Sequence, residues 1–135
     1  MNHPNIIKSL GFYEGDKNQA PTFLFEYYSK PLFEVIKTLD DAFLISIIYE
    51  IGHAMMIAHS NNLIHRNLNI NDIFIDYNNH AKIRGFGTPV LINQTEQINS
   101  YQYGSLFCLS RELLQNKEYT EKVDSFAFGM ITLYI

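Results

Sequence analysis

The feature that most constrains the fold is a long apolar stripe near the middle of the sequence. Six apolar residues recur with the i, i+3, i+4, i+7 spacing of one helix face: Leu44, Ile47, Ile48, Ile51, Met55 and Ala58. Asp40 and Asp41 precede them, where negative charge favours a helix N-terminus. Ser60, Asn61 and Asn62 follow, and Asn tolerates the left-handed conformation that ends many helices. The sequence therefore predicts one long helix with one face in a core.

Short apolar segments on both sides of this helix have the composition of β-strands. Ile6–Tyr13 and Thr22–Tyr27 are two such strands, and a polar segment turns between them. Asp72–Asp76 and Ala81–Arg84 are two more, joined through an Asn-Asn pair. We expect one strand pair before the long helix and one hairpin after it.

Three further helices are predicted. Ser29 as cap and Pro31 near the first helical position begin a short one, with an apolar face of Leu32, Ile36 and Leu39. After a long polar loop, Ser110 caps a second short helix. Thr120 precedes the last helix, which ends at Ile135. With the strands, these helices make the fold class α+β.

The last helix is apolar nearly all round, which is typical of a buried helix. Its apolar residues are Val123, Phe126, Phe128, Met130, Ile131, Leu133, Tyr134 and Ile135. Few segments of this chain remain to cover it. We expect the bare chain to be marginally folded, self-associating, or part of something larger.

The composition excludes some classes of function. The chain has 135 residues, of which 47% are hydrophobic and 18% charged, enough for a core. The net charge is −4 with no basic stripe, which argues against nucleic acid. No uninterrupted apolar run approaches ~18 residues, so no membrane span is expected. The single cysteine, Cys108, cannot form an internal disulfide, and we expect an intracellular, cytoplasmic setting.

Two segments carry the chemistry. HRNLNINDI, from His65 to Ile73, keeps the frame of the catalytic pattern H-R-D-L-x-x-x-N. KIRGFG, from Lys82 to Gly87, is similar to the strand that leads into D-F-G. Five other segments accompany them in order: HPNIIK (3–8), FEYY (25–28), AHSNNLIHR (58–66), GSLFCLSRE (104–112) and YTEKVDSFAFG (119–129).

Together these segments resemble the protein kinase family, of the eukaryotic serine/threonine or tyrosine-kinase-like type. The resemblance covers essentially the whole chain and implies a partial kinase domain over residues 1–135. Residues 1–30 would be the end of the small lobe and the hinge, and residues 31–135 the mostly helical large lobe. The fold would then be truncated at both ends.

The resemblance implies that the catalytic machinery is altered. Asn67 stands where the catalytic base should be, and Asn cannot accept a proton at neutral pH; a lost base typically costs ~10²–10⁴ in rate. Asn69 stands where serine/threonine kinases usually carry a Lys. Arg66 either pairs with a phosphate on the activation loop or is held by backbone carbonyls. The phosphate could be carried by Thr88, Thr95, Ser100, Tyr101, Tyr103 or Ser105.

The metal site is altered as well. Gly85 replaces the metal-binding Asp of D-F-G, so a carboxylate is lost. Asp72 replaces the Asn that binds magnesium; it is either a relocated, weak ligand or an ordinary turn residue. We expect no Mg²⁺ site.

Other positions have nucleotide-binding or structural roles by the same resemblance. Glu26, Tyr28 and Phe74 would face a nucleotide, but these residues include no glycine-rich loop or small-lobe Lys, so ATP binding is expected to be weak. The expected structural residues are His65, Phe86, Glu112 and Asp124; Phe86 would pack beside His65, and Asp124 would tie the catalytic loop to the last helix.

Three functions stay open from the sequence. The first is a pseudokinase, a binding or regulatory module for a protein partner, which could be missing kinase lobes or another chain. The second is part of a longer protein with serine/threonine kinase activity. The third is a decayed or incomplete gene product with no independent role.

Overall fold

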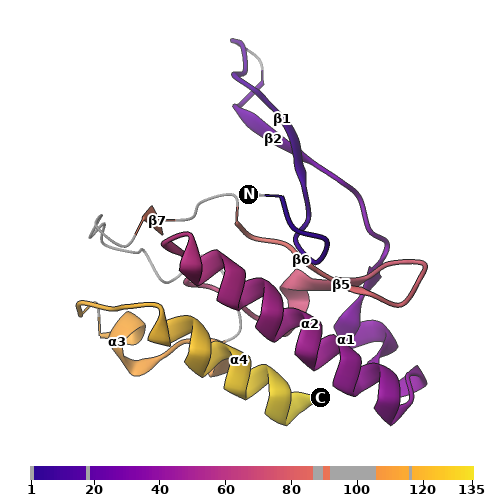
Figure 1. The fold of residues 1–135 in the computed structure, drawn as a ribbon. Helices are drawn as coiled ribbons and strands as arrows, with labels where there is room; N and C mark the ends of the chain where they lie inside the picture. The colour runs from indigo at the N-terminus through magenta and orange to yellow at the C-terminus, as the bar shows by residue number, and fades with distance from the viewer. Residues whose placement is uncertain (1, 18, 87–89, 92–105, 116) are drawn as a thin grey trace.

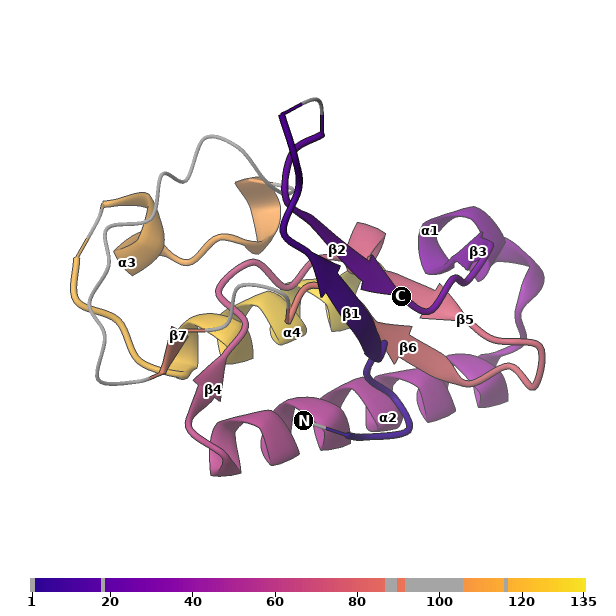
Figure 2. The same cartoon turned by 90° about the horizontal axis from the view of Figure 1, so that it is seen from above.

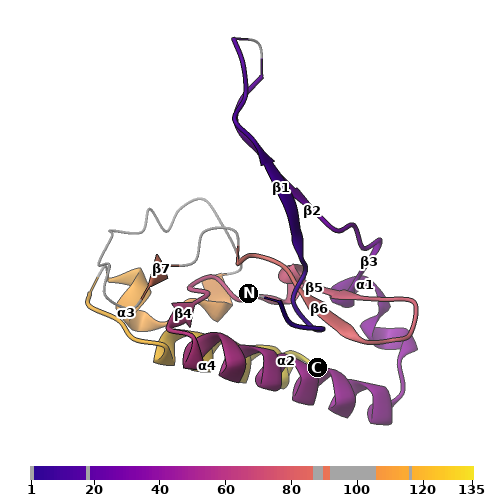
Figure 3. The same cartoon turned by 45° about the horizontal axis from the view of Figure 1, so that its top comes forward.

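The computed structural model describes residues 2–17, 19–86, 90–91, 106–115 and 117–135. Two helices, α2 (Asp41–Ser60) and α4 (Lys122–Tyr134), lie side by side and form the base of the molecule (Figures 1 and 3). A hairpin of β5 (Ile73–Ile75) and β6 (Ala81–Ile83) lies over α2.

Helix α2 confirms the main sequence prediction. The Asp40 carboxylate accepts a hydrogen bond from the Phe43 N–H at 2.9 Å and caps the N-terminus. Beyond the C-terminus, Asn62 adopts a φ of +58°, the predicted left-handed conformation. The buried residues of the helix are Ile47, Ile51, Ala54, Met55 and Ala58, and Leu44 packs against the same core.

Both strand pairs are present, with shorter strands than predicted. β1 (Ser9–Tyr13) pairs antiparallel with β2 (Thr22–Phe25), and this hairpin stands away from the body (Figure 3). β5 pairs antiparallel with β6 around a turn in which Asn79 has a φ of +65°. β3 (Lys30–Pro31) adds a third strand beside β5. Figure 2 shows β5 on the side of α1 and β6 on the side of α2.

The predicted cap of the first short helix was wrong. Helix α1 (Leu32–Val35) begins after Pro31, and no side chain caps it. Lys30 and Pro31 pair with β5 instead, which places Ser29 a strand away from the helix. Pro31 is itself the N-cap residue, with an extended backbone, and a 3₁₀ turn (Ile36–Thr38) extends the helix.

The core has two parts. The larger lies between α2, the β5–β6 hairpin and α4, and the smaller consists of Ile64, Leu109, Leu113 and Val123. Ser110 precedes α3 (Arg111–Leu114), as predicted, but makes no side-chain cap. β4 (Leu63–Ile64) pairs with β7 (Val90–Leu91), and a 3₁₀ turn (Leu106–Cys108) precedes α3.

Helix α4 is buried on one side only. Val123, Ala127 and Ile131 face the core, whereas Leu133 and Tyr134 are 83% and 60% exposed. The sequence is apolar nearly all round this helix, and the expectation was that the bare chain would leave part of that surface uncovered. The outer face is therefore an apolar surface that the described residues do not cover.

We expect Leu133→Ser to reduce self-association without loss of stability, because the wild-type side chain is exposed. The matched change Ile131→Ala should lower the free energy of unfolding by about 2–4 kcal/mol, since Ile131 is buried. Sedimentation velocity and urea unfolding measure the two effects. An equal loss of stability in both variants would mean that the outer face of α4 is packed in solution.

Helix α2 is also long and apolar enough to cross a membrane, judged by length and composition alone. Its apolar residues do not form an unbroken run, because Ser46, Glu50 and His53 interrupt them. One such helix is weak evidence, because core helices pass the same test. Here α2 packs Ile47, Ile51 and Ala58 into the core.

Glu50 of α2 holds the N-terminal segment in place. Its Oε2 accepts hydrogen bonds from Asn5 Nδ2 at 3.1 Å and from the Ala81 N–H at 2.6 Å. Its Oε1 lies 2.6 Å from His80 Nδ1. This one carboxylate joins the segment HPNIIK to α2 and β6.

The hydrogen bond to Glu50 and its charge raise the pKa of His80. The stabilisation should be fully present below the unfolded pKa of about 6.5 and lost as pH rises through the folded pKa. We expect His80→Gln to cost less than about 1 kcal/mol at pH 5.5, because the pair is exposed, and nothing at pH 9. Urea unfolding across pH checks this. Burial and His53 lower the pKa of His3, which gives stability the opposite dependence on pH. Wild type and His80→Gln both contain His3, so its contribution cancels when their free energies of unfolding are subtracted. A cost that grows with pH would contradict the assignment.

Candidate functional site

The segment from His65 to Asp72 is held from below by a buried carboxylate on α4. The Asp124 side chain is 1% exposed and accepts hydrogen bonds from the N–H groups of His65 and Arg66, each at 2.8 Å. His59 Nε2 lies 2.9 Å from the same carboxylate. Arg66 has a φ of +68°, a conformation that costs energy in a non-glycine residue. Asp124 therefore fixes a strained turn at the start of the segment.

His65 connects three parts of the site. Its Nε2 lies 2.9 Å from the Arg84 carbonyl, and its Nδ1 accepts a hydrogen bond from the Asn67 N–H at 3.4 Å. These partners assign the proton to Nε2 of a neutral imidazole. The ring also contacts Phe86 edge-on, with centroids 4.8 Å apart. His65 thus acts here as a buried packing and bridging residue.

Gly85 occupies a position that only glycine fits well. Its φ is +111°, and a Cβ added there would lie 2.7 Å from Cε1 and Nε2 of His65. The imidazole cannot move aside freely, because Arg84 and Asn67 hold both of its nitrogens. A side chain at position 85 would therefore collide with His65.

Asn69 lies inside the loop rather than on a ligand-facing surface. It is 2% exposed, and its Nδ2 donates to the Asn67 carbonyl at 2.8 Å and to the Asp72 carboxylate. Its Oδ1 accepts from the Asn71 N–H and begins the 3₁₀ turn Ile70–Asp72. The side chain of Asn67 is half-buried. The short side-chain amide of Asn69 points inward and bonds to other residues of the loop.

Asp72 is paired with a cation of this chain. Its Oδ1 lies 3.1 Å and 3.2 Å from the terminal and ε nitrogens of Arg84, and its Oδ2 accepts from Asn69. The Arg84 guanidinium also lies over the Phe74 ring, 5.0 Å from its centroid. Both carboxylate oxygens of Asp72 therefore have protein partners.

Glu26 and Tyr28, which the resemblance assigned to a hinge, contact each other and the segment that precedes β1. Glu26 donates its backbone N–H to the Lys8 carbonyl at 3.0 Å, and its carboxylate accepts from the Tyr28 hydroxyl at 3.2 Å. Burial raises the pKa of Tyr28, and the Glu26 carboxylate raises it further. Lys82 Nζ lies over the Tyr28 ring at 5.6 Å and 3.5 Å from Asp76.

The donor set does not fit a magnesium ion. Mg²⁺ takes oxygen ligands, usually with one or two carboxylates. Position 85 has no carboxylate, and the guanidinium of Arg84 neutralises that of Asp72. Across the described ranges, no group of three or more His, Cys, Asp or Glu residues could hold a metal ion.

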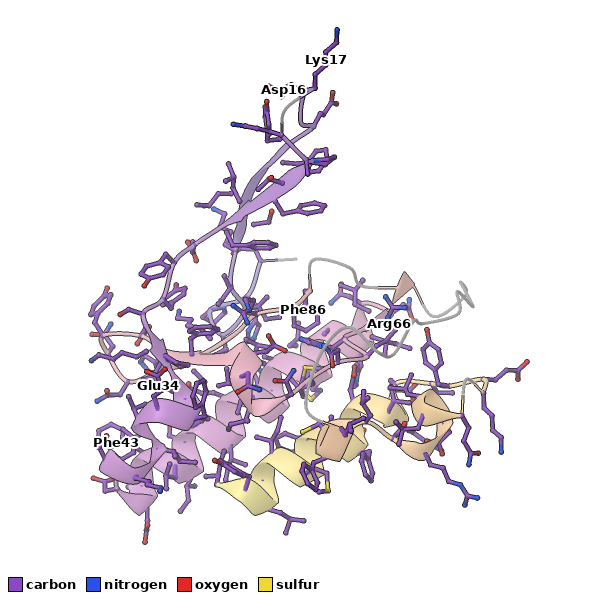
Figure 4. The ribbon with its side chains drawn as sticks, turned by 180° about the vertical axis from the view of Figure 1, so that it is seen from behind. Asp16, Lys17, Glu34, Phe43, Arg66 and Phe86 are labelled. Atoms are coloured by element: carbon purple, nitrogen blue, oxygen red, sulfur yellow. The ribbon has the colours of Figure 1, made fainter. Side chains whose placement is uncertain are left out.

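Some predicted residues stand apart from this cluster. Glu112 is exposed in the first turn of α3, where a hydrogen bond from its own backbone N–H is the main cause that lowers the pKa of its carboxyl. Arg66 and Phe86 lie on the body of the molecule, far from the hairpin tip at Asp16 and Lys17 (Figure 4). The predicted phosphate-bearing residues lie outside the described ranges: Thr88, Thr95, Ser100, Tyr101, Tyr103 and Ser105.

Similarity to known proteins extends over the whole chain. The family model described as "Protein kinase domain" matches residues 1–135. The chain belongs to the protein kinase family. It is 30% identical over 135 residues to an Aurora kinase of Saccharomyces cerevisiae, covering 97% of this chain and 36% of that protein. It is 31% identical over 140 residues to the "Probable serine/threonine-protein kinase KIN1 homolog" of Enterocytozoon bieneusi, covering 100% of this chain and 23% of that protein. This kinase-family chain thus spans about a third or less of the length of these relatives.

Sequence reasoning about this kinase-family chain missed Arg84, Lys82 and Glu50. A signal for the first two was present in the alternation of the sequence: Lys82 lies in β6 and Arg84 directly follows the strand, one on each side of the buried Ile83. Phe74 lies directly opposite Lys82 in the register, so these two residues share one face of the hairpin. Glu50 gave no comparable signal, because its partners Asn5 and Ala81 are distant in sequence.

Proposed function

We propose that this chain is a catalytically impaired kinase domain, a pseudokinase that acts as a binding or regulatory module. The observation that carries the proposal is the contact between Gly85 and His65. The space where a metal-binding carboxylate would begin is filled by an imidazole held at both nitrogens. The missing base at Asn67 adds a second, independent defect, since phosphoryl transfer needs both an oriented nucleophile and neutralised phosphates.

The proposal includes weak ATP binding and no Mg²⁺ requirement. Glu26, Tyr28 and Phe74 would form the hinge and floor of a nucleotide site. Residues 1–30 would serve as small-lobe end and hinge, and residues 31–135 as large lobe. The free, buried Cys108 is consistent with an intracellular, cytoplasmic setting.

The partner in this proposal is a protein. The outer face of α4 and the β1–β2 hairpin both expose large apolar side chains, among them Leu133, Tyr134, Phe12 and Leu24. Such surfaces are typical of protein contacts. Missing kinase lobes, a second copy or another chain would each cover them. A net charge of −4 does not favour nucleic acid.

A second candidate is a segment of a longer, active serine/threonine kinase. The observation in its favour is coverage: the chain spans 36% of one named kinase and 23% of another. A longer product would supply a small lobe, but it would not change Asn67 or Gly85.

A phosphotransfer assay separates the two candidates. The longest natural product that contains this chain is incubated with radiolabelled ATP, Mg²⁺ or Mn²⁺, and a mixed protein substrate. We expect no transfer above that of a heat-denatured control. Transfer that Asp72→Ala abolishes, and that Leu133→Ser leaves unchanged, would favour the active kinase and reject the pseudokinase proposal.

A further inference from the structure

The β5–β6 hairpin has one face in the core and one face outward. Ile73, Ile75, Ala81 and Ile83 are buried, whereas Phe74 and Lys82 alternate with them and are half-buried. Phe74 and Lys82 are directly opposed in the register. The outward face is therefore built around an aromatic ring, and it is the face that would receive a nucleotide base in the proposed function.

A guanidinium already covers that ring. The Arg84 guanidinium carbon lies 5.0 Å from the centroid of Phe74, and its nitrogens lie 3.1 Å and 3.2 Å from Asp72 Oδ1. The backbone holds the same residue, because the Arg84 N–H donates to the Asp72 carbonyl at 2.7 Å. Asn69 fixes the other oxygen of the Asp72 carboxylate. The guanidinium of Arg84 is thus held between the Phe74 ring, over which it lies, and the Asp72 carboxylate, with which it pairs.

We propose that Arg84 is the residue that keeps purines off this face. A planar base that stacks on Phe74 needs the space above the ring, which the guanidinium occupies. Binding would require Arg84 to give up both a cation–π contact and an ion pair. Both contacts are made by the solvent-exposed Arg84 side chain, and the free energy needed to break them lowers the affinity for a purine by about tenfold. The inference rests on the assignment of Phe74 to the nucleotide face, and not on the loss of catalysis.

Lys82 provides the matched control. It carries the same charge on the same face, but it lies over Tyr28 and is paired with Asp76. Its Nζ also donates to the Pro4 carbonyl at 2.6 Å. Removing this charge leaves the contact between Arg84 and Phe74 in place. A change in purine affinity that both variants share would be an effect of charge. A change in affinity seen only in Arg84→Gln would show the effect of uncovering the Phe74 ring.

The test is a titration with adenosine, which has no phosphate, so that loss of a positive charge does not itself weaken binding. Binding of wild type, Arg84→Gln and Lys82→Gln is followed by NMR shifts of the backbone amides, in EDTA. We expect Arg84→Gln to bind about tenfold more tightly than wild type, with the largest shifts at Phe74. Lys82→Gln should bind like wild type. The amide spectra themselves report whether each variant is folded.

Four results would overturn the inference. Weaker adenosine binding by Arg84→Gln than by wild type would mean that the base stacks on the guanidinium. Equal binding would mean that the base does not contact Arg84. An equal gain in both variants would assign the effect to charge. Absence of adenosine binding in all three proteins would mean that Phe74 is not a purine face. None of these outcomes bears on catalysis, which the phosphotransfer assay tests separately.

Discussion

Asp124→Ala is expected to lower the free energy of unfolding by about 3–5 kcal/mol, enough to unfold much of a marginally stable chain. The substitution removes the acceptor of two backbone N–H groups, those of His65 and Arg66, which lie 2.8 Å from it. It also removes the partner of His59. The left-handed conformation of Arg66 would then lose the backbone hydrogen bond to Asp124 that supports it. Urea unfolding followed by circular dichroism measures the loss.

Asp124→Asn is the matched control for this prediction. An Asn side chain keeps one acceptor oxygen and nearly the same volume, so it should cost clearly less than Ala. The two N–H groups bond to different oxygens of Asp124, so equal losses in the two variants would mean that one acceptor oxygen alone does not hold the turn. A loss below about 1 kcal/mol in Asp124→Ala would contradict the role given to this carboxylate.

The second large effect concerns Gly85. Gly85→Asp, which restores the residue of the kinase pattern, is expected to destabilise the chain by about 2–4 kcal/mol and to restore no phosphotransfer. The new Cβ would lie 2.7 Å from the His65 ring at a φ of +111°. Relieving that contact requires His65 to leave the Arg84 carbonyl, the Asn67 N–H or the Phe86 ring. Thermal unfolding and the phosphotransfer assay measure the two outcomes.

Two variants separate the causes of this effect. Gly85→Ala adds the Cβ without a carboxylate, and we expect it to account for most of the lost stability. Asn67→Asp changes a half-buried amide to a carboxylate and should leave stability nearly unchanged. The account would be wrong if Gly85→Asp were as stable as wild type. It would also be wrong if the double variant Asn67→Asp, Gly85→Asp turned over ATP in the presence of Mg²⁺.

The regular elements of the fold were predictable because their signals are local. The stripe of α2, the cap at Asp40 and the turn at Asn79 depend on residues within a few positions of each other. The cap at Ser29 was mispredicted for a tertiary reason: Lys30 and Pro31 pair with Ile75 and Phe74 of β5, which lie far along the chain. The open face of α4 depends on what covers it, which the helix sequence does not encode.

The site was less predictable for a similar reason. The resemblance identified His65, Phe86 and Asp124 as neighbours, and the structure brings them together around the loop. It placed Asn69 where serine/threonine kinases usually carry a Lys, but it gave no indication that this side chain is buried and bound to Asp72. The pairing of Asp72 with Arg84 joins two residues twelve positions apart across a hairpin. Such contacts follow from strand register and not from the motif.

The most direct test of the central claim is a titration of the chain with Mn²⁺, a paramagnetic probe for a magnesium site, followed by NMR line broadening. The claim is that Asp72, neutralised by Arg84, and a carboxylate-free position 85 leave no divalent cation site. The account predicts no selective broadening of the Asp72 and Gly85 amides up to millimolar Mn²⁺. Selective broadening of those amides at micromolar Mn²⁺, lost in Asp72→Asn, would contradict it.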